Sequence, residues 1–238
     1  MRFAWQRLTP GVYRCRLPFC DVTVGLVVGG GGALLVDTGT TLTEAAAIER
    51  DVEELASTAV THIVLMHKHF DHILGSGQFA GAEIHCAPEV VDAMSSGQNQ
   101  LRADALSHGA DADEIDQAIA ALRPPRHGIA DLVVDLGGRE VRVRHLGRGH
   151  TASDLVVAAP AVGEHGSRAV VFTGDLVEES ADPAIDADSD VSAWPQTLDR
   201  LLATVGEAAI YVPGHGGVVG APFIRRQRDW LRRRAATI

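Results

Sequence analysis

The stretch His67-Lys68-His69-Phe70-Asp71-His72 decides the fold prediction, because it places four candidate metal ligands within six residues. It follows an apolar run at residues 62–66, which is typical of a buried strand, and it precedes a short helix expected to end near Phe79. Buried polar groups need partners, so such a strand end is poor core material. Imidazole nitrogens and carboxylate oxygens are standard ligands of zinc, iron and manganese. The stretch therefore predicts a metal site at the end of a strand.

The bulk composition indicates a globular protein. The chain has 238 residues, 46% of them hydrophobic and 22% charged, which suits one large domain with a full core. A formal net charge of -10 argues against the basic surface of a nucleic-acid-binding protein. The first residues lack the apolar region of a secretory signal, and no stretch approaches the ~20 apolar residues of a membrane span. We expect a cytoplasmic protein without nucleic-acid or membrane partners, and we make no prediction of its oligomeric state.

The three cysteines are expected to be free thiols. Cys15, Cys20 and Cys86 are odd in number and form no C-x-x-C pair.

Two other motifs resemble ligand-binding loops but have structural explanations. The glycine run at 29–32 lacks both the Gly-Lys-Ser/Thr ending and the following helix of a phosphate-binding loop, so it indicates a hairpin turn. The acidic run at 186–190 lacks the glycine and the glutamate that a calcium loop requires.

Strand-like and helix-like segments alternate along the chain. The pattern Thr41-Leu42-Thr43-Glu44 is a capping box, and it predicts a helix over residues 43–57. Further helices are expected within 88–122, at 194–205 and at 221–234, the last one packed by one face with an arginine-rich exterior. Strands are expected at 22–28, 33–36, 62–66, 83–86, 132–136, 141–146, 155–159, 169–173 and 209–212. This order predicts one domain over residues 1–238, built from two similar halves at about 1–127 and 128–238.

Three later positions complete the candidate ligand set. His150, Asp175 and His215 each follow an expected strand and have glycine neighbours, which allow close approach of the backbone. Ligands held at strand ends by short loops suit a rigid, preorganised site. If the chain is extended after residue 66, His67, His69 and Asp71 share one face and His72 points elsewhere. That geometry favours two neighbouring metals over one.

These motifs together resemble the metallo-β-lactamase fold superfamily. The His-x-His-x-Asp-His stretch, Gly-His-Thr at 149–151, Gly-Asp at 174–175 and Pro-Gly-His at 213–215 occur in the family's order. An earlier Leu-Val-Asp-Thr-Gly motif at 35–39 supplies Asp37, for which we expect a supporting or structural role beside the site. The resemblance implies an α/β (α+β) fold: a four-layer αββα sandwich of two mixed β-sheets between helices, with the site at one edge of the sheets.

The number of ligands also favours two metals. Five histidines and two aspartates are more than the roughly three protein ligands of one catalytic zinc. We expect the cofactor to be two divalent ions, most simply zinc, with iron or manganese as alternatives. One ion is expected to bind three histidines: His67, His69 and His150. The other is expected to bind one aspartate and two histidines: Asp71, His72 and His215. Asp175 is expected to bridge the two ions.

Such a centre predicts a dinuclear metal-dependent hydrolase. A metal-bridging hydroxide would attack a small-molecule ester, lactone, thioester, amide or phosphoester, and Asp71 would orient the hydroxide or take its proton. The formal charges leave one positive charge, which favours an anionic transition state. A mononuclear-iron, persulfide-dioxygenase-like oxidoreductase and an authentic β-lactamase are the alternatives. The segments 88–127 and 178–193 are expected to select the substrate. The remaining histidines are expected to be structural: His62, His85, His108, His127, His145 and His165.

Overall fold

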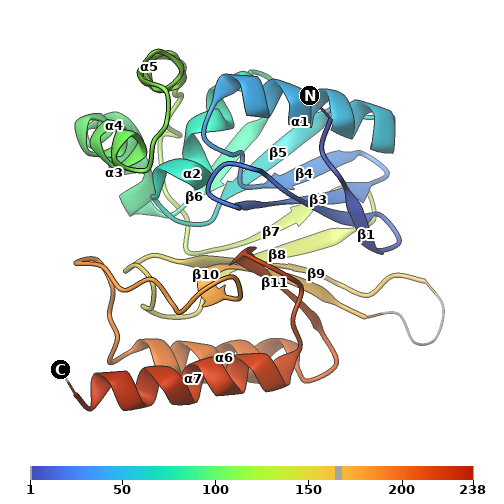
Figure 1. Ribbon diagram of the computed structural model, residues 1–238. Coiled ribbons are helices and arrows are strands. Elements are labelled where there is room, and N and C mark those ends of the chain that lie inside the picture. Colours follow the sequence, from blue (N-terminus) through green and yellow to red (C-terminus); the bar gives the residue numbers. More distant parts are fainter. Residues whose placement is uncertain (1, 164–167, 238) are drawn as a thin grey trace.

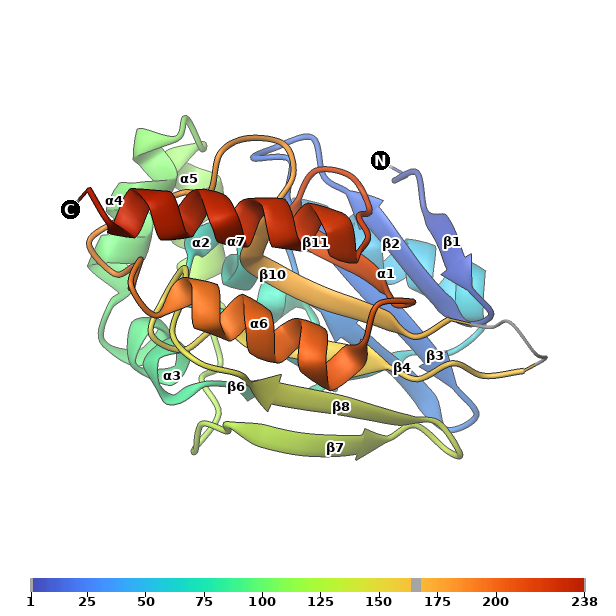
Figure 2. The ribbon, with the colours of Figure 1, turned by 90° about the horizontal axis from the view of Figure 1, so that it is seen from below.

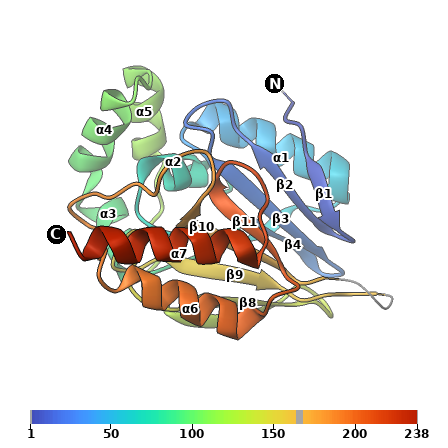
Figure 3. The ribbon, with the colours of Figure 1, turned by 60° about the horizontal axis from the view of Figure 1, so that its bottom comes forward.

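The computed structural model describes residues 2–163 and 168–237, and its elements form four layers (Figure 1). Helix α1 (Leu42–Ala56) covers a six-stranded sheet, which faces a five-stranded sheet. Helices α6 (Trp194–Val205) and α7 (Ala221–Ala235) lie side by side on the outer face of the second sheet, as Figures 2 and 3 show. The expected αββα sandwich is therefore confirmed. His165 lies outside the described residues.

The first sheet has the strand order β1-β2-β3-β4-β5-β6. The pairs β4–β5 and β5–β6 are parallel and the other pairs are antiparallel, so the sheet is mixed. Neither of the first two strands was among the expected strands. The bounds are β1 Gln6–Thr9, β2 Val12–Arg16, β3 Thr23–Gly29, β4 Gly32–Val36, β5 Val60–Leu65 and β6 Glu83–Cys86.

The second sheet has the strand order β11-β10-β9-β8-β7. Only β10 and β11 pair in parallel, so this sheet is mixed as well. Two strands run further than expected, which places Asp175 inside β10 and makes His215 the last residue of β11. The bounds are β7 Asp131–Asp135, β8 Glu140–His145, β9 Leu155–Ala159, β10 Val170–Glu178 and β11 Ile210–His215.

Local signals explain most of the helical layer. The capping box of α1 is present, with Glu44 N–H donating to Thr41 Oγ1 and Glu44 Oε2 accepting the Thr41 N–H. The segment within 88–122 is helical as expected and contains three short helices. The elements between β5 and β7 are α2 Phe70–Ile73, the 3-10 helix η1 Leu74–Gln78, α3 Pro88–Ser95, α4 Gln98–Ser107 and α5 Ala112–Ala120.

The core holds the two sheets close together. A Cβ atom on Gly25 of β3 would lie 2.3 Å from the Phe172 ring of β10, so glycine is required for this approach. A second apolar cluster joins the lower sheet to α6 and α7 through residues such as Trp194 and Leu231. The arginines of α7 face outward, and Arg228 pairs with Asp199 as expected for a packed helix with a charged exterior. Within residues 2–163 and 168–237, no helix is long and apolar enough to cross a membrane.

Candidate metal centre

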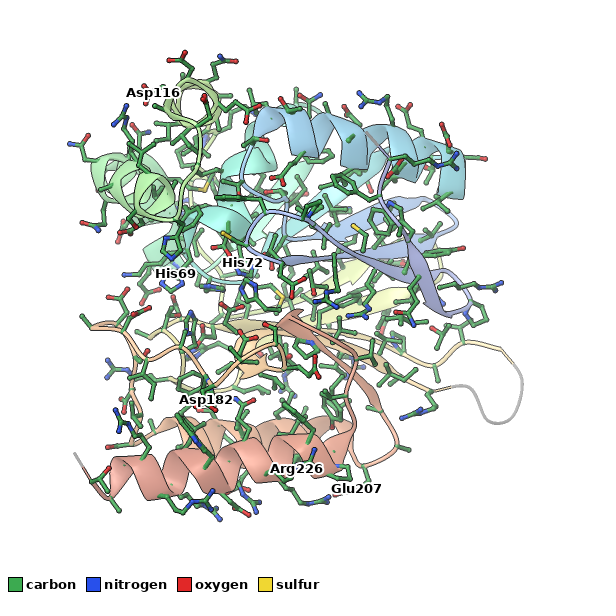
Figure 4. All side chains as sticks on the ribbon, in the orientation of Figure 1. His69, His72, Asp116, Asp182, Glu207 and Arg226 are labelled. Atoms are coloured by element: carbon green, nitrogen blue, oxygen red, sulfur yellow. The ribbon has the colours of Figure 1, made fainter. Side chains whose placement is uncertain are left out.

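All seven predicted ligands come together at one edge of the two sheets. His67 and His69 directly follow β5, and Asp71 and His72 lie on α2. The second sheet contributes the other three: His150 from the loop between β8 and β9, Asp175 from β10 and His215 from the end of β11. Figure 4 shows His69 and His72 between the upper and lower layers, far from Asp116 on α5 and Glu207 near α7.

The Asp175 carboxylate lies at the centre of this group. Its Oδ2 is 3.6 Å from Nε2 of His67, 3.4 Å from Nε2 of His150 and 3.3 Å from Nε2 of His215. Its Oδ1 is 3.3 Å from Nε2 of His72. One carboxylate therefore contacts histidines from both predicted ligand groups.

The ligand atoms form two clusters, in each of which they lie within 4.8 Å of one another. One cluster contains His67, His69, His150 and Asp175, and the other contains Asp71, His72 and His215. This is the grouping expected from the sequence, although metal ligation itself stays a prediction. The geometric premise for it was wrong, because the chain is not extended through residue 71. Helix α2 begins at Phe70 and turns His72 back, so that its ring centroid lies 4.2 Å from that of His67.

Hydrogen bonds on the outer ring nitrogens direct the inner ones toward the centre. His72 Nδ1 is 2.8 Å from Asp37 Oδ2, and His215 Nδ1 is 2.8 Å from the Cys20 carbonyl oxygen. His150 Nδ1 is 3.2 Å from the Ala184 carbonyl oxygen. A ring that donates from Nδ1 keeps a lone pair on Nε2, which is the usual arrangement of metal-binding histidines. All three Nε2 atoms face Asp175.

Asp37 joins the early Leu-Val-Asp-Thr-Gly motif to the site. It follows β4, is 1% exposed and has a φ of 59°, a conformation that aspartate tolerates better than most residues. Its Oδ1 accepts the Met66 N–H at 2.9 Å, while Oδ2 faces His72. Asp37 thus binds the backbone just after β5 and orients the His72 imidazole. This is the supporting role expected for it.

Several inner atoms are buried and have no hydrogen-bond partner within the described part of the chain. They are Nδ1 and Nε2 of His67, Nε2 of His72 and Oδ1 of Asp175. Burying a polar atom without a partner costs free energy, and native proteins rarely tolerate several such atoms together. Nitrogen and carboxylate donors that converge in this way fit a cation. The residues present therefore match the metal site that the motifs imply.

The pKa shifts of the histidines agree with a centre whose carboxylates need a compensating positive charge. Burial and the nearby His72 hold the pKa of His67 well below its usual value, so His67 is neutral. Burial opposes protonation of His72, but the Asp175 and Asp71 carboxylates outweigh it and raise the His72 pKa well above its usual value. For His215, burial lowers the pKa, but the Asp175 carboxylate outweighs burial and raises the pKa to about 9. The negative charge of the carboxylates can be compensated either by protons on these two rings or by a divalent cation.

The loop between β10 and α6 contacts the site through residues that the sequence analysis missed. Lys68 Nζ lies 2.8 Å from Asp188 Oδ2, and that same oxygen is 3.8 Å from Nε2 of His69.

Glu178, the last residue of β10, lies close enough to Asp175 and His215 to form a third possible ligand group with them. The pairing of Glu178 with His215 depends on the β10–β11 register, which the sequence does not reveal. Asp154 caps its loop by accepting the Thr151 N–H at 2.8 Å.

Comparison with known proteins gives a consistent result. Residues 17–215 match the sequence model of the metallo-beta-lactamase superfamily. The chain is 33% identical over 111 residues to the type 2 metallo-beta-lactamase of Bacteroides fragilis, covering 45% of this chain and 42% of that one. It is 30% identical over 101 residues to the metallo-beta-lactamase IND-1 of Chryseobacterium indologenes, covering 42% and 40%. The matched region thus spans less than half the length of these relatives.

Solved structures resemble the whole chain. The metallo-beta-lactamase FIM-1 from Pseudomonas aeruginosa, in a mono-zinc form, superposes with a TM-score of 0.72 at 19% identity, over 98% of this chain and 96% of that one. A metallo-beta-lactamase from Pontibacter korlensis gives a TM-score of 0.71 at 21% identity, over 97% and 99%. At these identities the likeness shows the fold alone.

Proposed function

Because the chain belongs to the metallo-beta-lactamase superfamily, we propose that it is a dinuclear metal-dependent hydrolase of small molecules. The observation that carries this proposal is the convergence of two ligand clusters on the buried Asp175 carboxylate. His67, His69 and His150 would hold one divalent ion, and Asp71, His72 and His215 the other, with Asp175 between them. Zinc suits these imidazole and carboxylate donors, and iron or manganese would accept the same set.

Bound divalent ions would polarise the substrate oxygen and lower the pKa of water toward ~7. The chain's own residues then have separate tasks. Asp71 is 7% exposed, with Oδ2 at 3.6 Å from His72 Nε2 and 3.5 Å from His215 Nε2. This position beside two imidazoles supports the role of Asp71 in orienting the hydroxide or taking its proton. Asp37, Ala184 and Cys20 fix the imidazole orientations from outside.

A hollow beside the segment that carries Cys20 has a size that suits a small-molecule substrate, and its lining contains none of the seven predicted ligands. It has a volume of about 320 Å³ and is lined in part by Phe19, Thr43 and Glu44. Phe19 adjoins Cys20, whose carbonyl oxygen contacts His215, and its ring centroid is 6.5 Å from that of Phe70. Small-molecule sites are commonly ~300–1,000 Å³ in size. The loop carrying Asp188 reaches the centre through Lys68, so it is the second candidate surface for substrate selection.

The bond that is cleaved belongs to the class of esters, lactones, thioesters, amides and phosphoesters. Within this class the amide of a β-lactam is the second candidate function, because the two relatives above carry the name metallo-beta-lactamase. We further propose the cytoplasm as the compartment, since all three cysteines are free thiols, as expected of a reducing environment.

Metal analysis coupled to a substrate panel tests the proposal. Purified protein should contain at least two equivalents of zinc, hydrolyse at least one substrate of the panel, lose this activity with chelator and regain it with zinc. The Asp71→Asn variant should lose at least about 100-fold in kcat, the lower range for general acid–base catalysis. Asp116→Asn, on the exposed side of α5 (Figure 4), is the matched control and should retain full activity. One equivalent of iron, with oxygen consumption on a persulfide substrate, would replace the hydrolase by the dioxygenase alternative.

A further inference from the structure

A second group of metal-ligating side chains lies on the parallel strands β5 and β6. In their register His62 pairs with Glu83, and Val64 pairs with His85. Paired residues on neighbouring strands share a face, as do residues two apart on one strand. His62, Glu83 and His85 therefore lie on the same face. Since β6 is the edge strand of its sheet, this group is accessible from the side of the molecule.

The side chains lie at distances that suit a shared cation. Nδ1 of His62 is 3.2 Å from Nε2 of His85, and the two rings stack with an interplanar angle of 22°. Glu83 Oε2 is 3.8 Å from His62 Nδ1. One ligand atom from each of the three residues lies within 4.8 Å of the others. With Zn–N bonds of ~2.0–2.1 Å, tetrahedral geometry separates two ligating nitrogens by about 3.3 Å. The observed separation of the two nitrogens is close to this value.

The burial and the donor types of the three side chains also suit a metal-binding site. His85 is 8% exposed, and burial, partly offset by Glu83, lowers its pKa, so it presents a neutral nitrogen. The His62 and Glu83 side chains are 24% and 70% exposed, which leaves an entry path and room for water ligands. Two imidazoles, one carboxylate and water form a donor set that zinc accepts.

We propose that His62, Glu83 and His85 form an additional zinc-class metal site, separate from the centre around Asp175. His62 lies within β5 and His67 follows the end of that strand five positions later, which corresponds to ~16 Å of extended chain at ~3.3 Å per residue. A bound ion would link β5 to the edge strand β6 and stabilise the sheet whose end carries His67 and His69. Cu²⁺ should bind more tightly than Zn²⁺, as the usual order of divalent-metal affinities predicts. The proposal is independent of the hydrolase activity.

Zinc uptake by the full chain tests this site. Protein whose main centre is saturated with zinc is titrated with further Zn²⁺ against a fluorescent chelator. Wild type should bind one more equivalent than the His62→Asn and Glu83→Gln variants, whose affinity for this ion should fall at least about tenfold, equivalent to 1.4 kcal/mol. Both substituted side chains are partly or largely exposed, so the fold should persist, which circular dichroism checks. His127→Asn, at an exposed histidine outside the cluster, is the matched control and should behave as wild type.

Copper provides a measurement specific to this site. When Cu²⁺ is added to the zinc-saturated protein, electron paramagnetic resonance should show coupling to two nitrogens, and this signal should disappear in His62→Asn. Hydrolysis by the variants should be unchanged. Equal zinc uptake by wild type and both variants, or a copper signal that persists in His62→Asn, would overturn the proposal and leave a simple hydrogen bond between the two imidazoles.

Discussion

The role of Asp37 leads to the most specific prediction, for the substitution Asp37→Asn. Asparagine is nearly isosteric with aspartate and tolerates the φ of 59° at this position. Its oxygen can still accept the Met66 N–H, but its amide group then faces His72 Nδ1 with a donor. His72 Nδ1 must become the acceptor, so the ring proton moves to Nε2. That nitrogen faces Asp175 at 3.3 Å and would no longer offer a lone pair to a metal.

The size of the expected effect follows from the position of Asp37 behind His72, which is a proposed metal ligand. Loss of such an outer partner typically weakens metal binding by ~10–100-fold, or ~1.4–2.7 kcal/mol. We expect the zinc affinity of the site that contains His72 to fall within this range. The ion held by His67, His69 and His150 should be much less affected, because Asp37 contacts none of these residues in the hydrogen bonds of the described structure.

Competition with a chromophoric chelator measures the two zinc affinities separately. The control is Asp51→Asn, which alters another buried carboxylate that accepts the Phe3 N–H at 2.8 Å and the Trp5 Nε1–H at 3.1 Å. This control should lower the free energy of unfolding without changing zinc affinity. If Asp37→Asn binds both ions as tightly as wild type, or if Asp51→Asn weakens zinc equally, the tautomer argument is wrong.

Three further predictions follow from the same structure. Removing the metals with a chelator should lower the Tm, since an ion present at 100 times its Kd contributes about 2.7 kcal/mol, and an unchanged melting curve would contradict the metal centre. Asp188→Ala should change zinc affinity less than about fivefold, as measured by chelator competition. The Lys68 and Asp188 side chains of the 2.8 Å pair are 33% and 40% exposed, so solvent screens the pair, and the 3.8 Å distance to His69 is too long for a hydrogen bond. Thr41→Ala should cost ~1 kcal/mol in urea unfolding by removing the α1 cap, and an unchanged midpoint would refute that contribution.

Local sequence patterns predicted the parts of the fold that depend on local physics. The capping box at Thr41 and Glu44 specifies the start of α1 through contacts between residues three apart. The Gly29–Gly32 pair closes the β3–β4 hairpin as expected. By contrast, the short strands β1 and β2 have no clear alternation of apolar residues. They are strands through pairing alone, because β2 pairs with β3 and β1 pairs with β2.

The candidate site was predictable as a set of residues but not as a geometry. Histidine, aspartate and glycine at strand ends are visible in the sequence, and they identified all seven converging positions. The hydrogen bonds that orient these rings are not visible, because they come from backbone carbonyls such as those of Cys20 and Ala184. The His62–His85 contact was missed for a related reason. It depends on the register between two parallel strands, and each histidine alone resembles a structural residue.

The parallel strand pairs explain why these distant residues meet. In the first sheet β4 and β5 are parallel, so Asp37 after β4 and His67 after β5 emerge at the same edge. In the second sheet β10 and β11 are parallel, which brings Asp175 and His215 to one edge in the same way. Ligands bind at the carboxyl ends of parallel strands because the chain there must turn and can present side chains. The antiparallel remainder of each sheet provides the scaffold and, from the loop between β8 and β9, His150. The sandwich aligns the two parallel edges across the Asp175 carboxylate. The position of the proposed metal centre therefore follows mainly from where parallel pairing occurs in each sheet.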